Sequence, residues 1–154
     1  MEGAIKEAIH AFKYRNLRAA APELGQLLAR YLKSHPMPGE VLVPVPLHPR
    51  RLRSRGYNQA ALLARELGKL SGLPVNERLL ARTKNTPPQV QTSNQEERHN
   101  NMAGSFECIG EARGLAVILV DDVTTTGSTL SACAAALKVA GAASVWGLAL
   151  AKER

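Results

Sequence analysis

Apolar residues in the first third of the chain recur at the spacing of an amphipathic helix. This pattern predicts one helix over residues 1–12 and a second helix that begins near Pro22. The apolar positions of the second helix are Leu24, Leu27, Leu28, Tyr31 and Leu32. The stretch SHPMPGE, residues 34–40, then ends the helical pattern, because proline and glycine both disfavour a helix interior.

The middle of the chain alternates between short apolar runs and polar or basic segments. The run VLVPV, residues 41–45, predicts a short buried strand, and the basic stretch after it, residues 46–56, predicts a loop. A helix is expected over about residues 58–70, because a serine, a glycine and a proline follow it as stop signals. Its apolar face carries Leu63, Leu67 and Leu70.

A polar segment separates this part of the chain from the last third. Residues 83–105 show no sustained hydrophobic period, and a stretch of this length is typical of a functional lid or of an inserted segment. The apolar runs on either side of it, residues 78–82 and 105–109, are candidates for a pair of strands.

The last third of the chain reads as a β-α-β unit. A strand is expected at residues 116–120, a helix at about 128–140 and a second strand at 144–150. Solidly apolar strands favour a parallel sheet that is covered on both faces. Because no repeat or linker divides the sequence, its 154 residues predict one α/β domain over residues 1–154.

Composition places this domain in a reducing, aqueous compartment. No apolar run approaches the roughly 20 residues that a membrane-spanning helix needs. The N-terminus lacks the layout of a signal peptide. Cys108 and Cys133 match no metal-binding spacing and are too few for a disulfide framework, so a cytoplasmic protein is the simplest expectation. The net charge of +7 favours an anionic partner, and nucleic acid, phosphorylated metabolites and mere solubility all remain open.

The most informative stretch is VILVDDVTTTGSTL, residues 117–130. Asp121 and Asp122 fall where a buried strand is expected to end, and ligands of open α/β sheets collect beyond the carboxyl ends of the strands. Small residues at positions 124–129 allow a close backbone approach, and successive N–H groups before a helix form a nest for phosphate. The carboxylates suit a sugar diol or the waters of Mg²⁺. Together these features describe a ribose 5-phosphate site.

A purely structural alternative exists for the same residues. Asp121 and Asp122 can simply end a strand while Ser128 caps the following helix. The stretch is neither a P-loop nor a glycine-rich dinucleotide turn, since it lacks the residues that define those motifs.

VILVDDVTTTGSTL resembles the phosphoribosyl diphosphate (PRPP) motif of type I phosphoribosyltransferases. Two further stretches, VPVPLHPRRLRSRGYNQA at 43–60 and TPPQ to ERHNNMAGSF within 86–106, resemble the ComF/GntX branch, which is associated with DNA uptake in competence. The likeness runs from about residue 41 to the C-terminus. The cysteine-rich N-terminal module of many members has no counterpart here, so a short form or a trimmed chain is expected.

The resemblance implies a type I phosphoribosyltransferase fold, a mainly parallel twisted sheet flanked by helices with a flexible lid hairpin. Residues 1–38 would be N-terminal helices and a candidate hood, 41–154 the core and 83–105 the lid. Asp121 and Asp122 would be the catalytic carboxylates that contact the ribose hydroxyls, directly or through Mg²⁺. The 5-phosphate would be held by Thr124, Thr125, Thr126, Gly127, Ser128 and Thr129, the pyrophosphate by Val45, Pro46 and Arg55, and the lid contacts would come from Lys84, Gln89 and Arg98.

The implied reaction is transfer of ribose 5-phosphate from PRPP to an unidentified acceptor, of which a nucleobase is one candidate, with Mg²⁺ as cofactor. Its oxocarbenium-like transition state needs charge stabilisation and protection from water. Two other functions stay open, a non-catalytic sensor of PRPP or a ribonucleotide, and a competence factor that binds single-stranded DNA or other competence proteins. His48 is expected to make a loop hydrogen bond, and a homodimer is a further candidate assembly.

Overall fold

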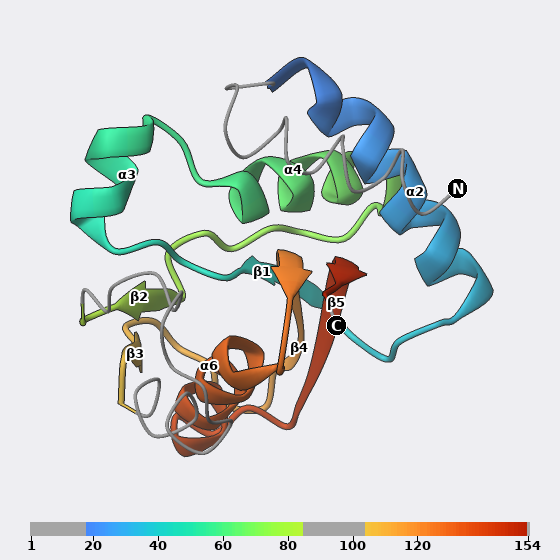
Figure 1. Cartoon of the computed structure of the whole chain (residues 1–154). Coiled ribbons are helices and arrows are strands. Elements are labelled where there is room, and N and C mark those ends of the chain that lie inside the picture. Colours follow the sequence, from blue (N-terminus) through green and yellow to red (C-terminus); the bar gives the residue numbers. More distant parts are fainter. Residues whose placement is uncertain (1–17, 85–103, 154) are drawn as a thin grey trace.

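The computed structural model describes residues 18–84 and 104–153. A three-stranded parallel sheet runs through the middle of the molecule (Figure 1), in the order β1 (Val41–Pro44), β4 (Ala116–Thr124) and β5 (Ser144–Lys152). The register pairs Val43 with Leu119 and Leu119 with Gly147. The expected parallel sheet is therefore confirmed, and the helix α6 (Ser128–Val139) completes the β-α-β unit.

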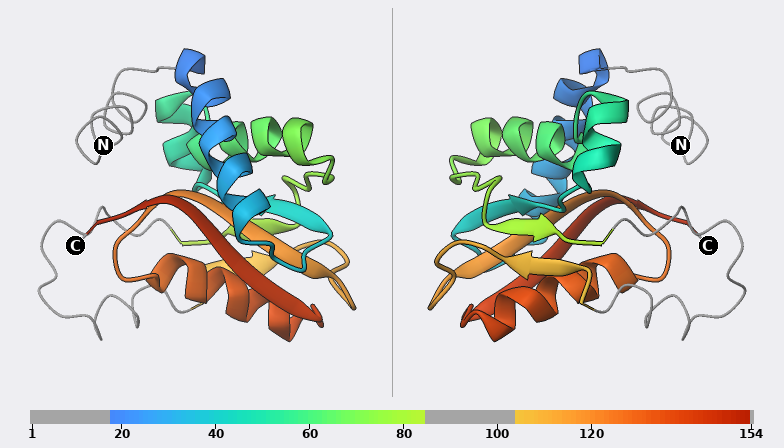
Figure 2. Two further views of the ribbon diagram at one scale, coloured as in Figure 1. Left: turned by 90° about the vertical axis from the view of Figure 1, so that its right-hand side faces the viewer. Right: turned by 90° about the vertical axis from the view of Figure 1, so that its left-hand side faces the viewer.

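Helices cover both faces of this sheet (Figure 2). On one face lie α2 (Ala21–Ser34), which follows the short helix η1 (Arg18–Ala20), and α4 (Gln59–Ser71). On the other face lies α6. Each layer has its own core: Leu42 and Leu63 belong to the α2–α4 side, whereas Val43 and Leu137 belong to the α6 side. Burying apolar area in this way is the main favourable term in folding.

The two long helices of the first layer follow the predicted spacing, with exceptions at their ends. Leu24, Leu28, Leu63 and Leu67 are buried as expected. In contrast, the side chains of Leu27, Tyr31 and Leu70 are exposed. At the crossing of α2 and α4, a Cβ on Gly25 would lie 2.5 Å from the Cβ of Glu66. Glycine at this position therefore lets the two helices approach closely.

The predicted pair of strands is also confirmed. β2 (Leu80–Arg82) and β3 (Phe106–Cys108) are antiparallel, and Ala81 lies opposite Glu107. Leu80 and Phe106 bury their side chains in the α6-side core, which fixes the hairpin against the main sheet. Residues 1–12 and most of the expected lid lie outside the described residues. No helix within residues 18–84 and 104–153 has the length and apolar character needed to cross a bilayer.

The basic stretch after β1 was expected to be a loop, and this prediction is wrong. It contains the helix α3 (Pro49–Arg55), which is bounded by strong local signals. His48 caps it, since its Nδ1 accepts a hydrogen bond from the N–H of Arg50 at 3.2 Å. Proline suits the first helical position, and Gly56 ends the helix in the left-handed conformation with φ +87°.

The cap of α3 should respond to pH. Partial desolvation, and then Arg50 and Arg82, lower the pKa of His48 from its ordinary value of 6.5. Protonation would also replace the Nδ1 acceptor by a donor. The contribution of His48 to stability is therefore complete above pH 6.5 and is lost as the pH falls below that value.

We expect His48→Asn to keep the cap, because asparagine is a strong N-cap residue, and to remove this part of the pH dependence. His48→Ala should lower the melting temperature at pH 8 relative to His48→Asn. Thermal unfolding of the three proteins between pH 5 and pH 8 tests this. Parallel pH profiles for the parent and His48→Asn proteins would contradict it.

Candidate functional site

The acidic pair lies inside a strand, not at its end. β4 was expected to stop at residue 120, but it continues to Thr124 because β5 pairs with it beyond the last residue of β1. Asp121 lies opposite Ala149, and Val123 lies opposite Ala151. Pairing with β5 therefore outweighs the low strand propensity of aspartate.

Because strand side chains alternate between the faces of a sheet, the two carboxylates diverge. Leu119 packs in the core on the α6 side, so Asp121 shares that face. Val120 packs in the core beneath α2 and α4, and Asp122 shares that opposite face. The two carboxylates therefore occupy two distinct locations.

Each carboxylate is oriented by the backbone that follows it. Oδ1 of Asp121 accepts a hydrogen bond from the N–H of Asp122 at 2.9 Å. Oδ1 of Asp122 accepts one from the N–H of Val123 at 2.7 Å. Asp122 is buried, at 8% exposure, while Asp121 is half-buried. Since a carboxylate has about four acceptor sites, both groups retain capacity for a ligand or a cation.

The Asp121 carboxylate lies in electrostatic reach of groups from two other elements. Burial, and then Asp121, raise the pKa of the Cys133 thiol on α6, so this cysteine is a neutral core residue. Burial, and then Arg51 of α3, lower the pKa of Arg82 on β2, while Cys133 and Asp121 act in the opposite direction. The guanidinium of Arg82 lies over the Phe106 ring, 5.4 Å from its centroid. The half-buried Arg82 is therefore in electrostatic reach of Asp121 on one side and of Arg51 on the other.

The loop after β4 has the geometry of an anion nest. Gly127 adopts the left-handed conformation, with φ +80° and ψ +5°, directly before the first residue of α6. No hydrogen bond within the described residues uses the N–H groups of Thr125, Thr126 or Gly127. Together with the N-terminus of α6, these donors can surround a phosphate.

Ser128 is not the cap of α6, which corrects the structural alternative considered from the sequence. Gly127 occupies the N-cap position, and Ser128 is the first helical residue. The hydroxyl of Thr126 accepts from the N–H of Ser128 at 3.3 Å, and the two side-chain oxygens lie 2.6 Å apart. These bonds hold the loop closed around its N–H groups, while Thr125 is exposed at its tip.

The segment after β1 reaches the same edge of the sheet. The N–H of Val45 donates to the carbonyl of Val120 at 2.9 Å. The carbonyl of Val45 accepts from Asn58 Nδ2 at 3.0 Å. Pro46 has no N–H, so neither residue offers a backbone donor to an anion. The first donors available on this segment are those of Leu47 and His48. Val45 and Pro46 therefore shape the loop.

The remaining expected site residues divide into two groups. Arg55 is exposed at the end of α3. Burial, and then the charge of Arg55 one turn away, lower the pKa of Arg51. Lys84 is exposed just after β2, where its carbonyl accepts from Arg82 Nε at 3.3 Å. Gln89 and Arg98 lie outside the described residues. Arg51 belongs to the basic run after β1 that the sequence already offered for pyrophosphate. Arg82 was missed from the sequence, because only the folded chain brings it into electrostatic reach of Asp121.

Comparisons with known proteins identify one family. Residues 52–152 match the phosphoribosyl transferase domain. The chain is 38% identical over 115 residues to Competence protein F of Haemophilus influenzae, a match that covers 71% of this chain and 50% of that protein. It is 33% identical over 143 residues to DNA utilization protein YhgH of Escherichia coli strain K12, covering 89% of this chain and 62% of that protein. This chain thus spans 50% to 62% of the length of these two relatives.

Solved structures share the fold at low sequence identity. Glutamine PRPP amidotransferase of B. subtilis, complexed with ADP and GMP, superposes with a TM-score of 0.57 and 19% identity, over 86% of this chain and 26% of that chain. Purine phosphoribosyltransferase of Pyrococcus horikoshii gives a TM-score of 0.50 and 17% identity, over 84% of this chain and 70% of that chain.

The left-handed residue of the nest is open to a direct test. A Cβ on Gly127 would meet no atom within 4 Å, so Gly127→Ala should cost only backbone strain, about 1–2 kcal/mol. Gly72, which ends α4 with φ +77° and is equally uncrowded, provides a matched control. We expect similar losses of unfolding free energy in the two variants, whereas only Gly127→Ala should weaken binding of inorganic phosphate. Equal phosphate affinity in both variants would argue against the nest.

Proposed function

This chain belongs to the phosphoribosyltransferase family, in its ComF-like branch, and we propose that it binds PRPP and transfers ribose 5-phosphate to an acceptor with release of pyrophosphate. The observation that supports this most strongly is the composition of one edge of the sheet. An anion nest and two ordered carboxylates lie at the end of β4, and the half-buried Arg82, which is coupled to Arg51, is in electrostatic reach of Asp121. PRPP carries a matching set of groups: a 5-phosphate, a ribose diol and a pyrophosphate.

The 5-phosphate would occupy the nest. Its oxygens would accept from the N–H groups that begin at Thr125 and from the hydroxyl groups of the loop. This part of the proposal involves Thr124, Thr125, Thr126, Gly127, Ser128 and Thr129. The partial positive charge at the N-terminus of α6 adds to the attraction.

The two carboxylates have separate roles in this proposal. Asp121, on the side of Arg82 and Arg51, would contact the ribose hydroxyls near the pyrophosphate. Asp122 is buried on the other face of the sheet. It would either contact the sugar from that face or hold the end of β4 in position. The pyrophosphate would lie against Arg51 and Arg82, with Arg55 beside them and the loop shaped by Val45 and Pro46 below.

Mg²⁺ fits the donor set as a cofactor shared with the substrate. Either Asp121 or Asp122 can supply carboxylate oxygens, each from its own face of the sheet. Within the described parts of the chain no group of three or more His, Cys, Asp or Glu side chains forms a metal site. Mg²⁺ is usually held by one or two carboxylates together with substrate phosphates and waters. When bound, it would neutralise charge on the leaving pyrophosphate. Arginines stabilise the same charge from the protein side.

Transfer requires positive charge on the sugar while the bond to pyrophosphate breaks. Fixed donors at the nest and fixed cations near Asp121 hold both ends of PRPP, which supplies positioning as well as charge stabilisation. Water has to be excluded, or PRPP would be hydrolysed. We assign that role to the 83–105 segment, with Lys84, Gln89 and Arg98 as its candidate contacts.

The biological setting follows from the relatives. Proteins named for competence and DNA utilization are similar to this chain, so we place it in DNA uptake or nucleotide metabolism inside the cell. The acceptor remains to be identified, with a nucleobase as the first candidate, and residues 1–38 would form the hood above it. A homodimer and contacts with competence proteins are compatible with this role.

A specific observation favours a second function, binding of single-stranded DNA. α3 carries Arg50, Arg51, Arg53 and Arg55 within seven residues, and no acidic residue occurs between Val41 and Arg65. Arg50, Arg53 and Arg55 are exposed and can contact a phosphate backbone. Such binding can coexist with the sugar-phosphate site, and it would also serve a non-catalytic sensor of PRPP.

We predict that PRPP with Mg²⁺ raises the melting temperature of the protein. Asp121→Asn should remove most of the shift, since it deletes the charge that faces the ribose and Mg²⁺. Asp122→Asn should reduce the shift and also change the melting temperature of the free protein, because Asp122 is buried. An undiminished shift in the double variant would refute the assignment of the two carboxylates.

Variants of Arg51 and Arg82 should distinguish binding of the pyrophosphate from binding of the sugar phosphate. We expect Arg51→Gln and Arg82→Gln each to weaken PRPP binding by about tenfold, equivalent to about 1.4 kcal/mol, and to leave ribose 5-phosphate binding nearly unchanged. Arg78→Gln serves as a control, since Arg78 is exposed outside α3 and β2. Calorimetry measures both ligands. Equal losses for PRPP and ribose 5-phosphate would place the pyrophosphate elsewhere.

The DNA function predicts a steep dependence on salt. Each phosphate contact that releases a counterion adds about −0.7 to the slope of log K against log salt for a single strand. Replacing Arg50 and Arg53 by glutamine should make this slope shallower by about 1.4 units while PRPP binding persists. Fluorescence anisotropy of a labelled oligonucleotide provides the measurement. A flat salt dependence in the parent protein would exclude a phosphate-driven surface.

A further inference from the structure

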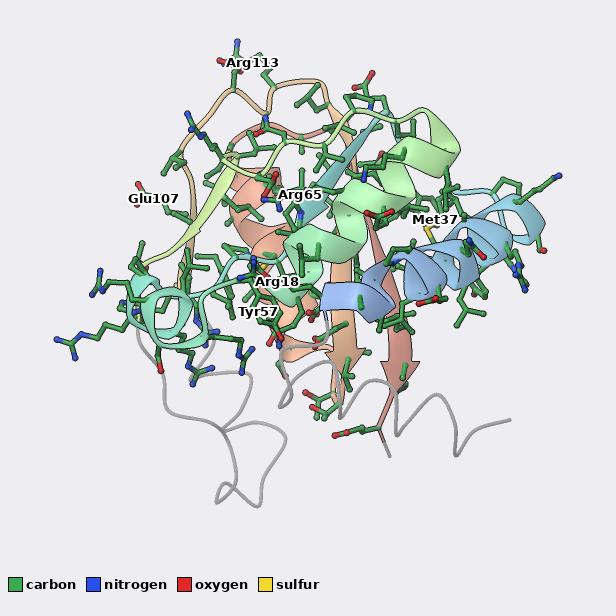
Figure 3. The ribbon with its side chains drawn as sticks, turned by 90° about the horizontal axis from the view of Figure 1, so that it is seen from above. Arg18, Met37, Tyr57, Arg65, Glu107 and Arg113 are labelled. Atoms are coloured by element: carbon green, nitrogen blue, oxygen red, sulfur yellow. The ribbon has the colours of Figure 1, made fainter. Side chains whose placement is uncertain are left out.

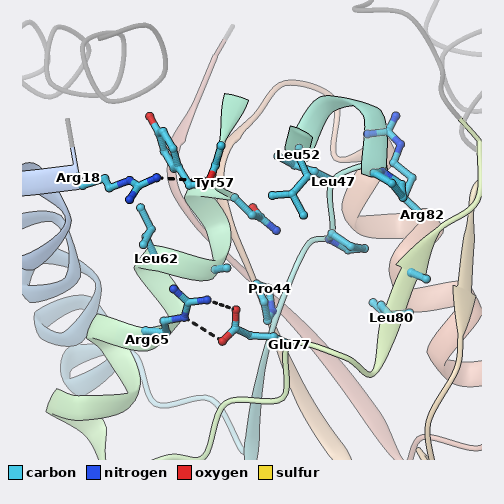
Figure 4. Close-up of a pocket in the computed structure, with 16 residues that line it drawn as sticks. Arg18, Pro44, Leu47, Leu52, Tyr57, Leu62, Arg65, Glu77, Leu80 and Arg82 are labelled. Carbon is cyan, nitrogen blue, oxygen red and sulfur yellow. Dashed lines mark hydrogen bonds and ion pairs between the residues drawn. The ribbon is translucent and has the colours of Figure 1, made fainter. Parts of the chain in front are cut away.

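A cavity of about 450 Å³ lies beside β1 and adjoins the segment that we place at the pyrophosphate, through Pro46, Leu47 and Arg82. Figure 4 shows its walls, which come from α3, α4, β2 and the segment after β1. Neither Asp121, Asp122 nor any residue of the loop 124–129 lines it. The apolar part of the lining consists of Pro44, Pro46, Leu47, Leu52, Ala61, Leu62 and Leu80. The volume lies in the range of small-molecule sites, and the apolar walls suit a flat ring.

One side of the cavity presents a hydrogen-bonding edge. Arg65 of α4 donates to both oxygens of Glu77, from Nε at 2.9 Å and from Nη2 at 2.6 Å. This fork leaves further guanidinium donors and further carboxylate lone pairs next to each other. Adjacent donors and acceptors match the edge of a nucleobase, which alternates N–H groups with carbonyl or ring-nitrogen acceptors.

Two cations lie on opposite sides of the same cavity, as Figure 4 shows. Arg18 donates a hydrogen bond from Nη2 to the carbonyl of Gly56 at 3.3 Å. The Arg18 guanidinium also lies 5.2 Å from the centre of the Tyr57 ring. In the view from above, Arg18 and Tyr57 lie next to each other at the start of α4 (Figure 3). Arg82 closes the other side. With Arg65, these side chains outnumber the one acidic residue of the lining, so an anionic ligand is favoured.

We propose that this cavity binds a nucleoside monophosphate, with the base against the Arg65–Glu77 pair and the phosphate at Arg18. The base would rest among the prolines and leucines of the wall. A free nucleoside shares the ring but lacks the anion, so it should bind more weakly.

The cavity can also influence the sugar-phosphate site. Pro46 and Leu47 line the cavity and belong to the segment expected beside the pyrophosphate. A ligand that packs against them therefore restricts the position of that segment and changes the affinity for PRPP. This coupling rests on the proposed function, whereas binding of the nucleotide does not.

The test uses the full chain with Asp121→Asn and Asp122→Asn, so that the sugar-phosphate site is disabled. Calorimetric titration with AMP, GMP, CMP and UMP should show that at least one of them binds at a single site, about tenfold more tightly than its nucleoside. Adding Glu77→Gln should weaken that binding by about tenfold, because an acceptor becomes a donor. Glu66→Gln is the matched control, since Glu66 pairs with Lys69 on the same helix and does not line the cavity.

A second variant, Arg65→Lys, keeps the charge but removes the two-point contact with Glu77, so it should also weaken nucleotide binding. It provides the test if the Glu77→Gln protein does not fold. Nucleotide binding to the parent protein that disappears in the Asn variants would overturn the inference and support the sugar-phosphate site alone. Equal effects of Glu66→Gln and Glu77→Gln would overturn it as well. If an oligonucleotide binds while none of the four monophosphates does, the inference is overturned and the cavity is part of a polynucleotide-binding surface. Nucleotide binding in the Asn variants, together with no response of the parent to PRPP, would support the cavity and refute the proposed function.

Discussion

The pairing of β4 with neighbours on both sides is the constraint on which the candidate site depends. β1 and β5 run parallel to β4, so their carboxyl ends meet at one edge of the sheet. That arrangement places the segment after β1 next to the loop after β4, although some 80 residues separate them in the chain. The apolar residues 117–120 hold β4 in place because they are completely or almost completely buried. A site made of loops therefore stands on the fully buried segment of β4.

The same strand explains how adjacent carboxylates are tolerated. Alternation sends Asp121 and Asp122 to opposite faces, which reduces their repulsion, and each accepts a backbone hydrogen bond from the next residue. Arg82, which is in electrostatic reach of Asp121, then offsets part of its charge.

Hydrophobic periodicity predicted most of the elements, because α2, α4, α6 and the three parallel strands each bury a regular apolar pattern. α3 was missed because arginines fill it, although His48, Pro49 and Gly56 mark its boundaries as clearly as an apolar stripe would. The extension of β4 was missed for a different reason, since only the pairing with β5 reveals it. The carboxylates and the phosphate loop were visible as a motif. Arg82 was not, because its relation to Asp121 exists only in the folded chain.

Two ligand sites on one small domain would give the chain both a reaction centre and a means of sensing nucleotides. The central claim concerns the first of these, the binding of PRPP at the edge of the sheet. The most direct measurement is a crystal structure of the chain soaked with PRPP and Mg²⁺. Our account predicts the 5-phosphate within hydrogen-bonding distance of the N–H groups at Thr125 to Gly127 and the pyrophosphate near Arg51 and Arg82. Density for PRPP at any other place, or an empty nest at saturating PRPP, would contradict it.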